Sequence, residues 1–300
     1  MSVSGKPRTY ADAEALKGHV TMLSETFHPR SAAHPENLQR VATYIELQFK
    51  KVSGRVSLQT FIVDGHPVHN VIAKFGPDTG RTIVIGAHYD SAQLTPGADD
   101  NASGVAGLIE LSRLLADREV LQPIELVAFT LEEPPHFKTT NMGSYRHAQS
   151  LRHAARQVDY MIGLEMIGMF SDAPGSQRYP HPLMRRYFPD EGNFIAIVGR
   201  LSDIGVTRSL KFAMASDAGL PVISINSPRE WLPIELSDHL NYWDAGFDAV
   251  MITDTAYYRN PNYHRATDIP ETLDYKRMAM VVDAVLRPLP TRLRVLETTP

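Results

Sequence analysis

The sequence predicts one α/β domain with a mixed, mostly parallel and twisted β-sheet sandwiched between helices. Three observations support this prediction. Short β-rich runs alternate with segments that carry apolar residues at helical spacing, and one of these runs is apolar on both faces, as in a strand covered on both sides. No linker or internal repeat divides the chain, so we treat residues 1–300 as a single domain.

The order of the elements follows from periodicity and turn residues. Residues 1–55 are expected to form N-terminal helices, over residues 10–27 and 37–51, because their apolar side chains recur at helical spacing. Three short β-rich runs come next, separated by Gly, Pro and Asp. The expected strands are 56–63, 68–75, 82–87, 124–131, 160–164, 194–198, 222–225 and 249–253, with further helices at 103–115, 202–214 and 275–286.

A long Pro- and Gly-rich stretch, residues 171–193, carries no clear periodicity. We interpret it as a long loop near the site rather than as a domain boundary, since such loops often shape substrate access.

Bulk properties narrow the classes of function. The 30 Lys and Arg against 34 Asp and Glu give a net charge of −4, without a dense basic cluster, which argues against nucleic acid or a membrane as partner. The chain has no cysteine, so a metal site must use nitrogen and oxygen ligands. The first 20 residues are polar and lack the apolar core of a signal peptide, so we expect a cytoplasmic protein. The sequence does not indicate an oligomeric state.

Two acidic or histidine-containing clusters follow strand candidates. His88 and Asp90 come after the strand 82–87 and point the same way, because side chains alternate along an extended chain; a surface pair would look the same. Glu132 and Glu133 follow the strand from residue 124. Two buried glutamates there would repel each other unless a cation neutralised one, although a solvated turn is the alternative.

Three further segments complete a candidate metal site. Asp99 and Asp100 precede a helix, where one of them could serve merely as a helix cap. Glu165 closes another apolar strand, and His264, taken alone, could be an ordinary loop histidine. The combined set has enough imidazoles and carboxylates for two zinc ions that share a bridging carboxylate: His88, Asp99, Glu133, Glu165 and His264.

At these residues the chain resembles the co-catalytic zinc aminopeptidase family, which also contains glutamate carboxypeptidases and single-zinc glutaminyl cyclases. The resemblance spans roughly residues 30–286. It rests on six segments in the family's order: GAHYDS, PGADDNASG, LEE, LEMIG, SDH and YHRATDIPETLDY. It implies the family's zinc exopeptidase fold and a site with two Zn²⁺ ions.

The resemblance also implies a role for each metal ligand. Asp99 is expected to bridge the two ions. His88 and Glu165 complete one metal site, and Glu133 and His264 complete the other.

Other roles carried over from the family concern the reaction itself. Glu132 is implied as the general base, and Asp90 as the carboxylate that orients His88. Tyr263 matches a tyrosine that assists the oxyanion in some family members, with a packing role as the alternative. The Asp99–Asp100 peptide bond matches one that is cis in the family.

Parts of the pattern differ from the family or have no assigned role. Glu165 stands where aminopeptidases usually have Asp, and residues 134–137 read Pro-Pro-His-Phe where the family usually has small residues. Residues 237–239 resemble a segment that lines the rim of the active site. Six large side chains could line the substrate pocket or simply pack: Arg178, Arg186, Arg229, Trp231, Trp243 and Tyr257.

The sequence therefore predicts a metal-dependent exopeptidase and, within that class, an aminopeptidase that acts on peptides with a free N-terminus. The alternatives are a glutaminyl cyclase-like enzyme with a single zinc, a carboxypeptidase acting on C-terminal residues, and a catalytically silent module that binds peptide termini.

Overall fold

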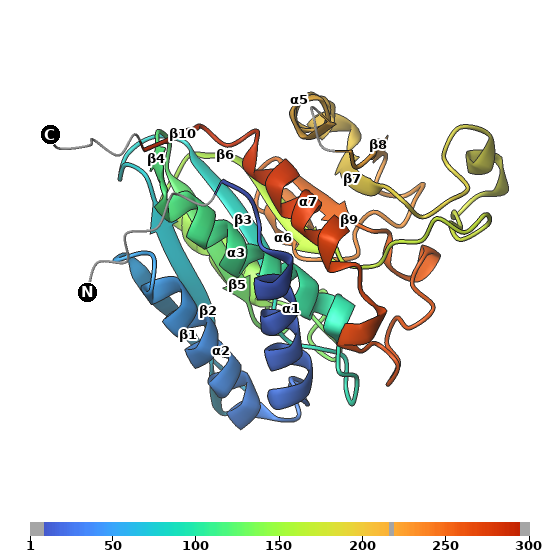
Figure 1. The fold of residues 1–300 in the computed structure, drawn as a ribbon. Helices are drawn as coiled ribbons and strands as arrows, with labels where there is room; N and C mark the ends of the chain where they lie inside the picture. Colours follow the sequence, from blue (N-terminus) through green and yellow to red (C-terminus); the bar gives the residue numbers. More distant parts are fainter. Residues whose placement is uncertain (1–8, 216–218, 295–300) are drawn as a thin grey trace, which may run out of the picture.

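An eight-stranded, twisted β-sheet forms the centre of the molecule in the computed structural model, which describes residues 9–215 and 219–294 (Figure 1). The strands lie in the spatial order β1-β2-β5-β3-β6-β9-β7-β8. Their bounds are β1 Val56–Val63, β2 His66–Phe75, β3 Thr82–His88, β5 Ile124–Phe129, β6 Val158–Glu165, β7 Ile195–Arg200, β8 Val222–Ser227 and β9 Ala249–Thr253. A separate antiparallel pair joins β4 Arg118–Val120 to β10 Thr291–Leu293.

The middle of the sheet is parallel. Strands β5, β3, β6 and β9 are neighbours that run in one direction, whereas β2 and β7 pair antiparallel to this group on either side. Parallel neighbours bring their carboxyl ends to the same edge of a sheet, so residues that follow β5, β3 and β6 meet there. The prediction of a mixed, mostly parallel sheet in a single α/β domain is confirmed.

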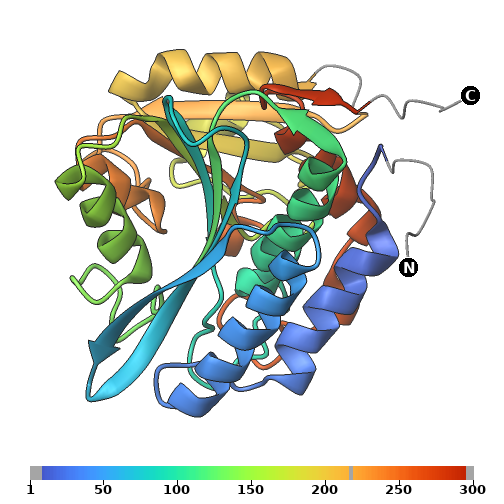
Figure 2. The ribbon, with the colours of Figure 1, turned by 90° about the vertical axis from the view of Figure 1, so that its left-hand side faces the viewer.

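Helices cover both faces of this sheet (Figure 2). One layer contains α1 Ala13–Thr21, α2 Pro35–Lys50, α3 Gly104–Ala116, α5 Ile204–Ala215 and α7 Tyr275–Leu286, with the π-helix η1 Met22–Thr26 continuing α1. The opposite layer contains α4 Gly143–His153 and α6 His239–Asp244. Short helical turns complete the chain: η2 Ala98–Ser103, η3 Pro182–Arg186, η4 Leu201–Asp203, η5 Ala256–Tyr258 and η6 Pro270–Thr272.

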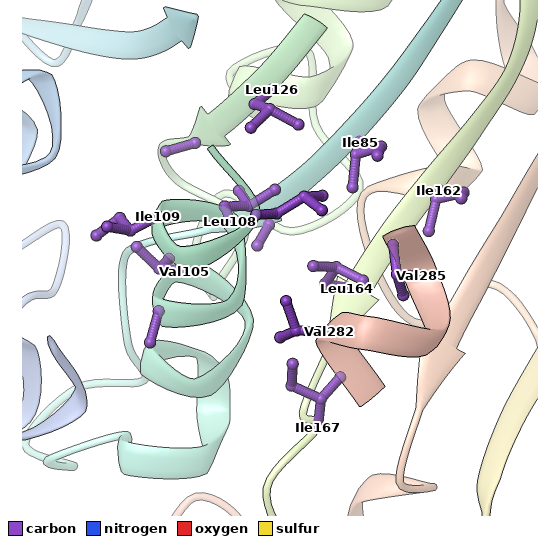
Figure 3. Close-up of a cluster of buried hydrophobic side chains, with 14 of the residues drawn as sticks. Ile85, Val105, Leu108, Ile109, Leu126, Ile162, Leu164, Ile167, Val282 and Val285 are labelled. Atoms are coloured by element: carbon purple, nitrogen blue, oxygen red, sulfur yellow. The ribbon is translucent and has the colours of Figure 1, made fainter. Parts of the chain in front are cut away.

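The larger apolar core lies between the sheet and α3 and α7 (Figure 3). Leu108 of α3 and Val282 of α7 lie in this core together with Ile85 and Ile162 of the central strands, and Val282 lies beside Leu164. These side chains are fully or almost fully buried. The apolar stripe of each helix therefore fixes it against the sheet and leaves the carboxyl edge of the parallel strands free for polar groups.

Several boundaries differ from the predicted ones for physical reasons. The expected strand 124–131 ends at Phe129, because Leu131 adopts a left-handed backbone conformation with φ 59° and turns the chain away from the sheet. Helix α4 was not predicted, since its sequence GSYRHAQSLRH is mostly polar and opens with glycine. Strands β4 and β10 have three residues each, which is too short for a periodic pattern.

Residues 171–193 form a long excursion that extends from the sheet, seen as the yellow-green segment at the right of Figure 1, and its only helical part is the short turn η3. Of the polar first 20 residues, residues 1–8 lie outside the described residues. None of the helices in residues 9–215 and 219–294 is both long and apolar enough to cross a bilayer.

Two glycine positions give opposite predictions for stability. A Cβ added to Gly86 of β3 would overlap the buried ring of Phe129, whereas one added to the exposed Gly18 of α1 would meet no atom within 4 Å. We expect Gly86→Ala to lower the free energy of unfolding by about 1–3 kcal/mol through overpacking. The matched Gly18→Ala should raise it by roughly 0.5–1 kcal/mol, because alanine is the better helix former.

Urea unfolding followed by circular dichroism measures both changes. Equal stability of the Gly86→Ala variant and the parent protein would contradict the close packing of β3 on β5.

Candidate active site

The candidate site lies where three neighbouring parallel strands end. His88 is the last residue of β3, Glu165 is the last residue of β6, and Glu132 and Glu133 follow β5. All four side chains are almost completely buried. The sequence places them far apart, and the parallel pairing of β5, β3 and β6 brings them to one edge.

Two clusters of possible metal ligands share one residue, Asp100. In the first, His88 Nε2 lies 3.2 Å from Glu165 Oε2 and 3.4 Å from Asp100 Oδ1. In the second, His264 Nε2 lies 3.1 Å from Asp100 Oδ2 and 3.3 Å from Glu133 Oε2. The two oxygens of one carboxylate therefore face two separate groups of nitrogen and oxygen donors.

This geometry corrects the expectation for Asp99. Its carboxylate lies in neither cluster and instead accepts hydrogen bonds from Gly168 N at 3.0 Å and Asn260 Nδ2 at 2.7 Å. Adjacent side chains leave the backbone in different directions, so only one of the two aspartates can face His88 and His264. The bridging position predicted for Asp99 belongs to Asp100.

The expected position of the cis peptide bond is also wrong. The cis bond joins Asp100 to Asn101, one residue later than predicted. Asp268 holds this turn in place, because its two carboxylate oxygens accept the backbone N–H groups of Asp99 at 3.0 Å and Asp100 at 3.1 Å. No role was predicted for Asp268 from the sequence, although it lies in the same segment as His264.

Asp90 connects two parts of the site. His88 Nδ1 hydrogen-bonds to the backbone carbonyl of Asp90 at 3.1 Å, and the Oδ1 of the Asp90 carboxylate lies 3.6 Å from the same nitrogen. The same carboxylate accepts the backbone N–H groups of Glu132 at 3.0 Å and Glu133 at 2.9 Å. Asp90 therefore fixes the turn after β5 as well as contacting the imidazole at the end of β3.

Residues 237–239 do not lie at a rim. Ser237, Asp238 and His239 are all buried. The hydroxyl of Ser237 donates a hydrogen bond of 2.6 Å to Glu165 Oε2, the oxygen that lies near His88. Ser237 thus positions the glutamate that stands where the related aminopeptidases usually have aspartate.

A buried arginine supports the loops behind these residues. Arg30 is fully buried, and its guanidinium donates hydrogen bonds to the carbonyls of Leu23, Tyr89, Pro96 and Gly97. Burial lowers the pKa of Arg30 to about 10, with Asp268 and other carboxylates opposing the shift, so the group stays positively charged at neutral pH. It joins the segment after β3 to the loop that leads to Asp100.

The donor set fits divalent metal ions. Four buried carboxylates, those of Asp100, Glu132, Glu133 and Glu165, surround two imidazoles. Glu133 Oε1 and His88 Nε2 are buried without a hydrogen-bond partner. Nitrogen and carboxylate oxygen are ligands that zinc accepts, and a cation between these groups would remove both the repulsion and the unpaired atoms.

Glu132 lies beside the clusters without belonging to either. Its Oε2 is 3.9 Å from His88 Nε2. Burial raises the pKa of Glu132 well above its ordinary value, and although His88 lowers it, the carboxylates of Glu133 and Glu165 raise it further. A carboxyl group with a raised pKa holds a proton more readily than an ordinary glutamate, which suits a group that takes up a proton and passes it on.

A cavity of about 240 Å³ opens over these groups, with Tyr263 in its wall. The Tyr263 ring stacks on His264 at 3.9 Å, and burial raises the pKa of its phenol, so the hydroxyl stays protonated. The rest of the lining is mostly apolar and comes from β7, β8, β9, the excursion 171–193 and the segment 232–236. Phe137, from the unusual Pro-Pro-His-Phe segment, also lines the cavity.

Comparison with solved structures gives the class of the protein. The fold resembles the LapA aminopeptidase of Legionella pneumophila, with a TM-score of 0.75 and 18% identity over 97% of this chain and 79% of that one. It also resembles BSAP, a zinc aminopeptidase from Bacillus subtilis, with a TM-score of 0.74 and 15% identity over 95% of both chains. A glutaminyl cyclase from Bacteroides thetaiotaomicron matches with a TM-score of 0.71 and 17% identity over 93% of this chain and 98% of that one. The fold is that of the zinc aminopeptidases and glutaminyl cyclases.

The chain belongs to peptidase family M28, whose sequence model matches residues 70–288. It is therefore a metal-dependent exopeptidase by family. It is 48% identical to the uncharacterized protein YfbL of Escherichia coli (strain K12) over 294 residues, which cover 95% of this chain and 90% of that protein. A leucine aminopeptidase 1 of Metarhizium robertsii is 26% identical over 223 residues, 70% of this chain, and the match spans about half (51%) of that protein's length.

The different surroundings of the two adjacent aspartates lead to a testable contrast. Asp100→Asn removes the negative charge that both clusters share and replaces one of its two oxygens by an amide nitrogen, so it should lower the zinc retained per chain, whereas Asp99→Asn should leave the zinc content near that of the parent protein. Mass spectrometry of dialysed, zinc-loaded protein measures the content. The reverse pattern, with zinc lost only on changing Asp99, would restore the prediction made from the sequence.

Proposed function

We propose that this protein is an aminopeptidase that hydrolyses the N-terminal peptide bond of its substrates at a site for two zinc ions. The observation that carries the proposal is the pair of ligand clusters sharing Asp100, with the buried carboxyl of Glu132 beside them. Membership of peptidase family M28 and similarity to proteins named aminopeptidases support the same activity.

The ligands divide between two metal positions. His88 and Glu165 would hold one zinc ion, Glu133 and His264 would hold the other, and Asp100 would contact both. When bound, the ions would supply Lewis-acid chemistry, which lowers the pKa of water and polarises a carbonyl group. Asp90 and Ser237 keep the ligands in place through the contacts described above.

Glu132 is proposed to move the proton. It accepts a proton from the attacking water and returns it to the nitrogen of the leaving peptide, and both steps need a pKa near the working pH. Burial of Glu132, with Glu133 and Glu165 nearby, raises its pKa above the ordinary value, which is the direction that this role requires.

Tyr263 is proposed to stabilise the oxyanion. Its hydroxyl remains a hydrogen-bond donor at neutral pH, and the stacking of its ring on His264 holds it beside the second ligand cluster. Such a donor favours the negative charge that develops on the carbonyl oxygen during attack.

The site also suits a free α-amine. A free α-amine has a basic nitrogen that can bind beside the metal ions and donate hydrogen bonds to the buried carboxylates of Asp100, Glu132, Glu133 and Glu165, whereas an acetylated nitrogen has no basic lone pair. The apolar cavity wall beyond these groups would receive the side chain of the first residue.

The deciding experiment compares free and N-acetylated leucyl peptides before and after chelation. We expect the protein to bind about two zinc ions per chain, to hydrolyse only the peptides with a free amine, and to lose this activity on chelation until zinc is restored. Release of C-terminal residues from the acetylated peptides would instead indicate a carboxypeptidase. Release of ammonia from N-terminal glutamine, without peptide hydrolysis, would indicate a cyclase.

Replacement of the proposed base tests the mechanism separately. Glu132→Gln keeps the size of the side chain but cannot accept a proton, so kcat should fall by about 10²–10⁴-fold. The zinc content and the circular dichroism spectrum should not change, because Glu132 belongs to neither ligand cluster. A variant that keeps most of its activity would exclude Glu132 as the base.

A further inference from the structure

Arg178 is the single lysine or arginine among the described residues that line the cavity. It lies on the excursion 171–193 and is joined to the segment after β9 by two hydrogen bonds. Its backbone N–H donates to the carbonyl of Tyr258 at 2.9 Å, and its guanidinium donates to the carbonyl of Tyr257 at 2.6 Å. The side chain of Arg178 is exposed to solvent, and these two hydrogen bonds tie the residue to the segment after β9 at the cavity.

The positive charge of Arg178 is not neutralised by the protein. In the part of the chain that the structure describes, its guanidinium bonds to a neutral carbonyl and forms no ion pair. Several other arginines are paired with carboxylates, for example Arg229 with Glu235 and Asp244, and Arg277 with Asp172. A guanidinium fixed in a cavity without a carboxylate partner is suited to bind a carboxylate from a ligand.

The position of Arg178 relative to the ligand clusters indicates which part of the substrate it contacts. Tyr257, whose carbonyl holds the guanidinium, lies 5.6 Å from the ring of Tyr263, and that ring stacks on His264. The α-amine of a substrate is drawn to the carboxylates of the clusters and is repelled by an arginine. Arg178 must therefore meet the substrate beyond its first amino group.

The lining of the cavity separates the side chain of the first residue from the rest of the substrate. Much of the cavity lining is apolar, with Leu232, Ile234, Met251 and Phe137 among its residues, and it suits an uncharged side chain. A carboxylate placed there would lose its hydration without gaining a partner. This leaves the residue that follows the scissile bond as the one that can place a carboxylate at Arg178.

We propose that Arg178 is a specificity-determining residue that pairs with a carboxylate on the residue after the scissile bond. This inference rests on the proposed aminopeptidase function and names its substrate class. The carboxylate is either the C-terminal carboxylate of a dipeptide or the acidic side chain of a longer peptide, since the guanidinium binds both in the same way.

Four substrates distinguish the sources of the carboxylate: Leu-Ala, Leu-Ala amide, Leu-Glu amide and Glu-Ala amide. The zinc-loaded parent protein should hydrolyse Leu-Ala, Leu-Glu amide or both with a kcat/KM about tenfold above that of Leu-Ala amide. Preference for Leu-Ala alone identifies the C-terminal carboxylate, and preference for Leu-Glu amide identifies the acidic side chain.

Arg178→Gln should abolish this preference, mainly by raising KM, because the lost contact is equally strong in the ground state and the transition state. Hydrolysis of Leu-Ala amide should change little. Arg186→Gln is the matched control, since Arg186 is exposed on the same excursion and does not line the cavity. Equal kcat/KM values for the acids and the amide in the parent protein would overturn the inference, as would a preference for Glu-Ala amide that depends on Arg178.

Binding without turnover separates this inference from the proposed function. Calorimetry on zinc-loaded Glu132→Gln protein should show tighter binding of Leu-Ala or Leu-Glu amide than of Leu-Ala amide, with the difference removed by adding Arg178→Gln. This result together with no hydrolysis by the parent protein would reject the proposed function and keep the carboxylate site. Hydrolysis by the parent protein, with equal binding of Leu-Ala, Leu-Glu amide and Leu-Ala amide, would support the proposed function and reject the carboxylate site.

Discussion

The repulsion among four buried carboxylates is the physical constraint on which the rest of this site depends. Asp100, Glu132, Glu133 and Glu165 gather around two imidazoles, at an edge of the sheet where water is largely excluded. Charges buried in this way are costly unless partners or cations offset them. The fold must therefore hold the carboxylates close together against their mutual repulsion, in an arrangement that a bound cation would stabilise.

The backbone provides much of this restraint. Asp90 accepts the N–H groups of Glu132 and Glu133, and Asp268 accepts those of Asp99 and Asp100, so each acidic turn is tied to a second segment of the chain. Arg30 adds a buried positive charge, but its donors contact backbone carbonyls rather than the ligand carboxylates. It stabilises the loops without occupying the place of a metal ion. The hydrogen bonds of the backbone thus restrain the carboxylates, whereas their negative charge would be neutralised by a bound cation.

The succession of strands and helices along the chain could be predicted from the sequence, as could the segments that meet at the candidate site, because apolar runs and the residues that follow them are local features. The choice between Asp99 and Asp100 could not. Both are adjacent, acidic and buried, and their surroundings are set by partners from other parts of the chain, such as Asn260 for Asp99 and His264 for Asp100. Helix α4 was missed for a related reason, since its polar sequence is stabilised by packing on distant parts of the chain rather than by its own periodicity.

The division between sheet and loops explains how one fold can serve different reactions. Three candidate metal ligands, His88, Glu165 and Glu133, lie at or just after strand ends. The positions of these strand ends follow from the pairing of β5, β3 and β6. The cavity walls come largely from segments outside the parallel centre of the sheet, including the excursion 171–193, which can change in sequence without moving the ligands. Aminopeptidases and a glutaminyl cyclase accordingly share this architecture. The selection of substrate must then be sought in side chains such as Arg178, which the excursion places at the cavity, rather than in the metal ligands.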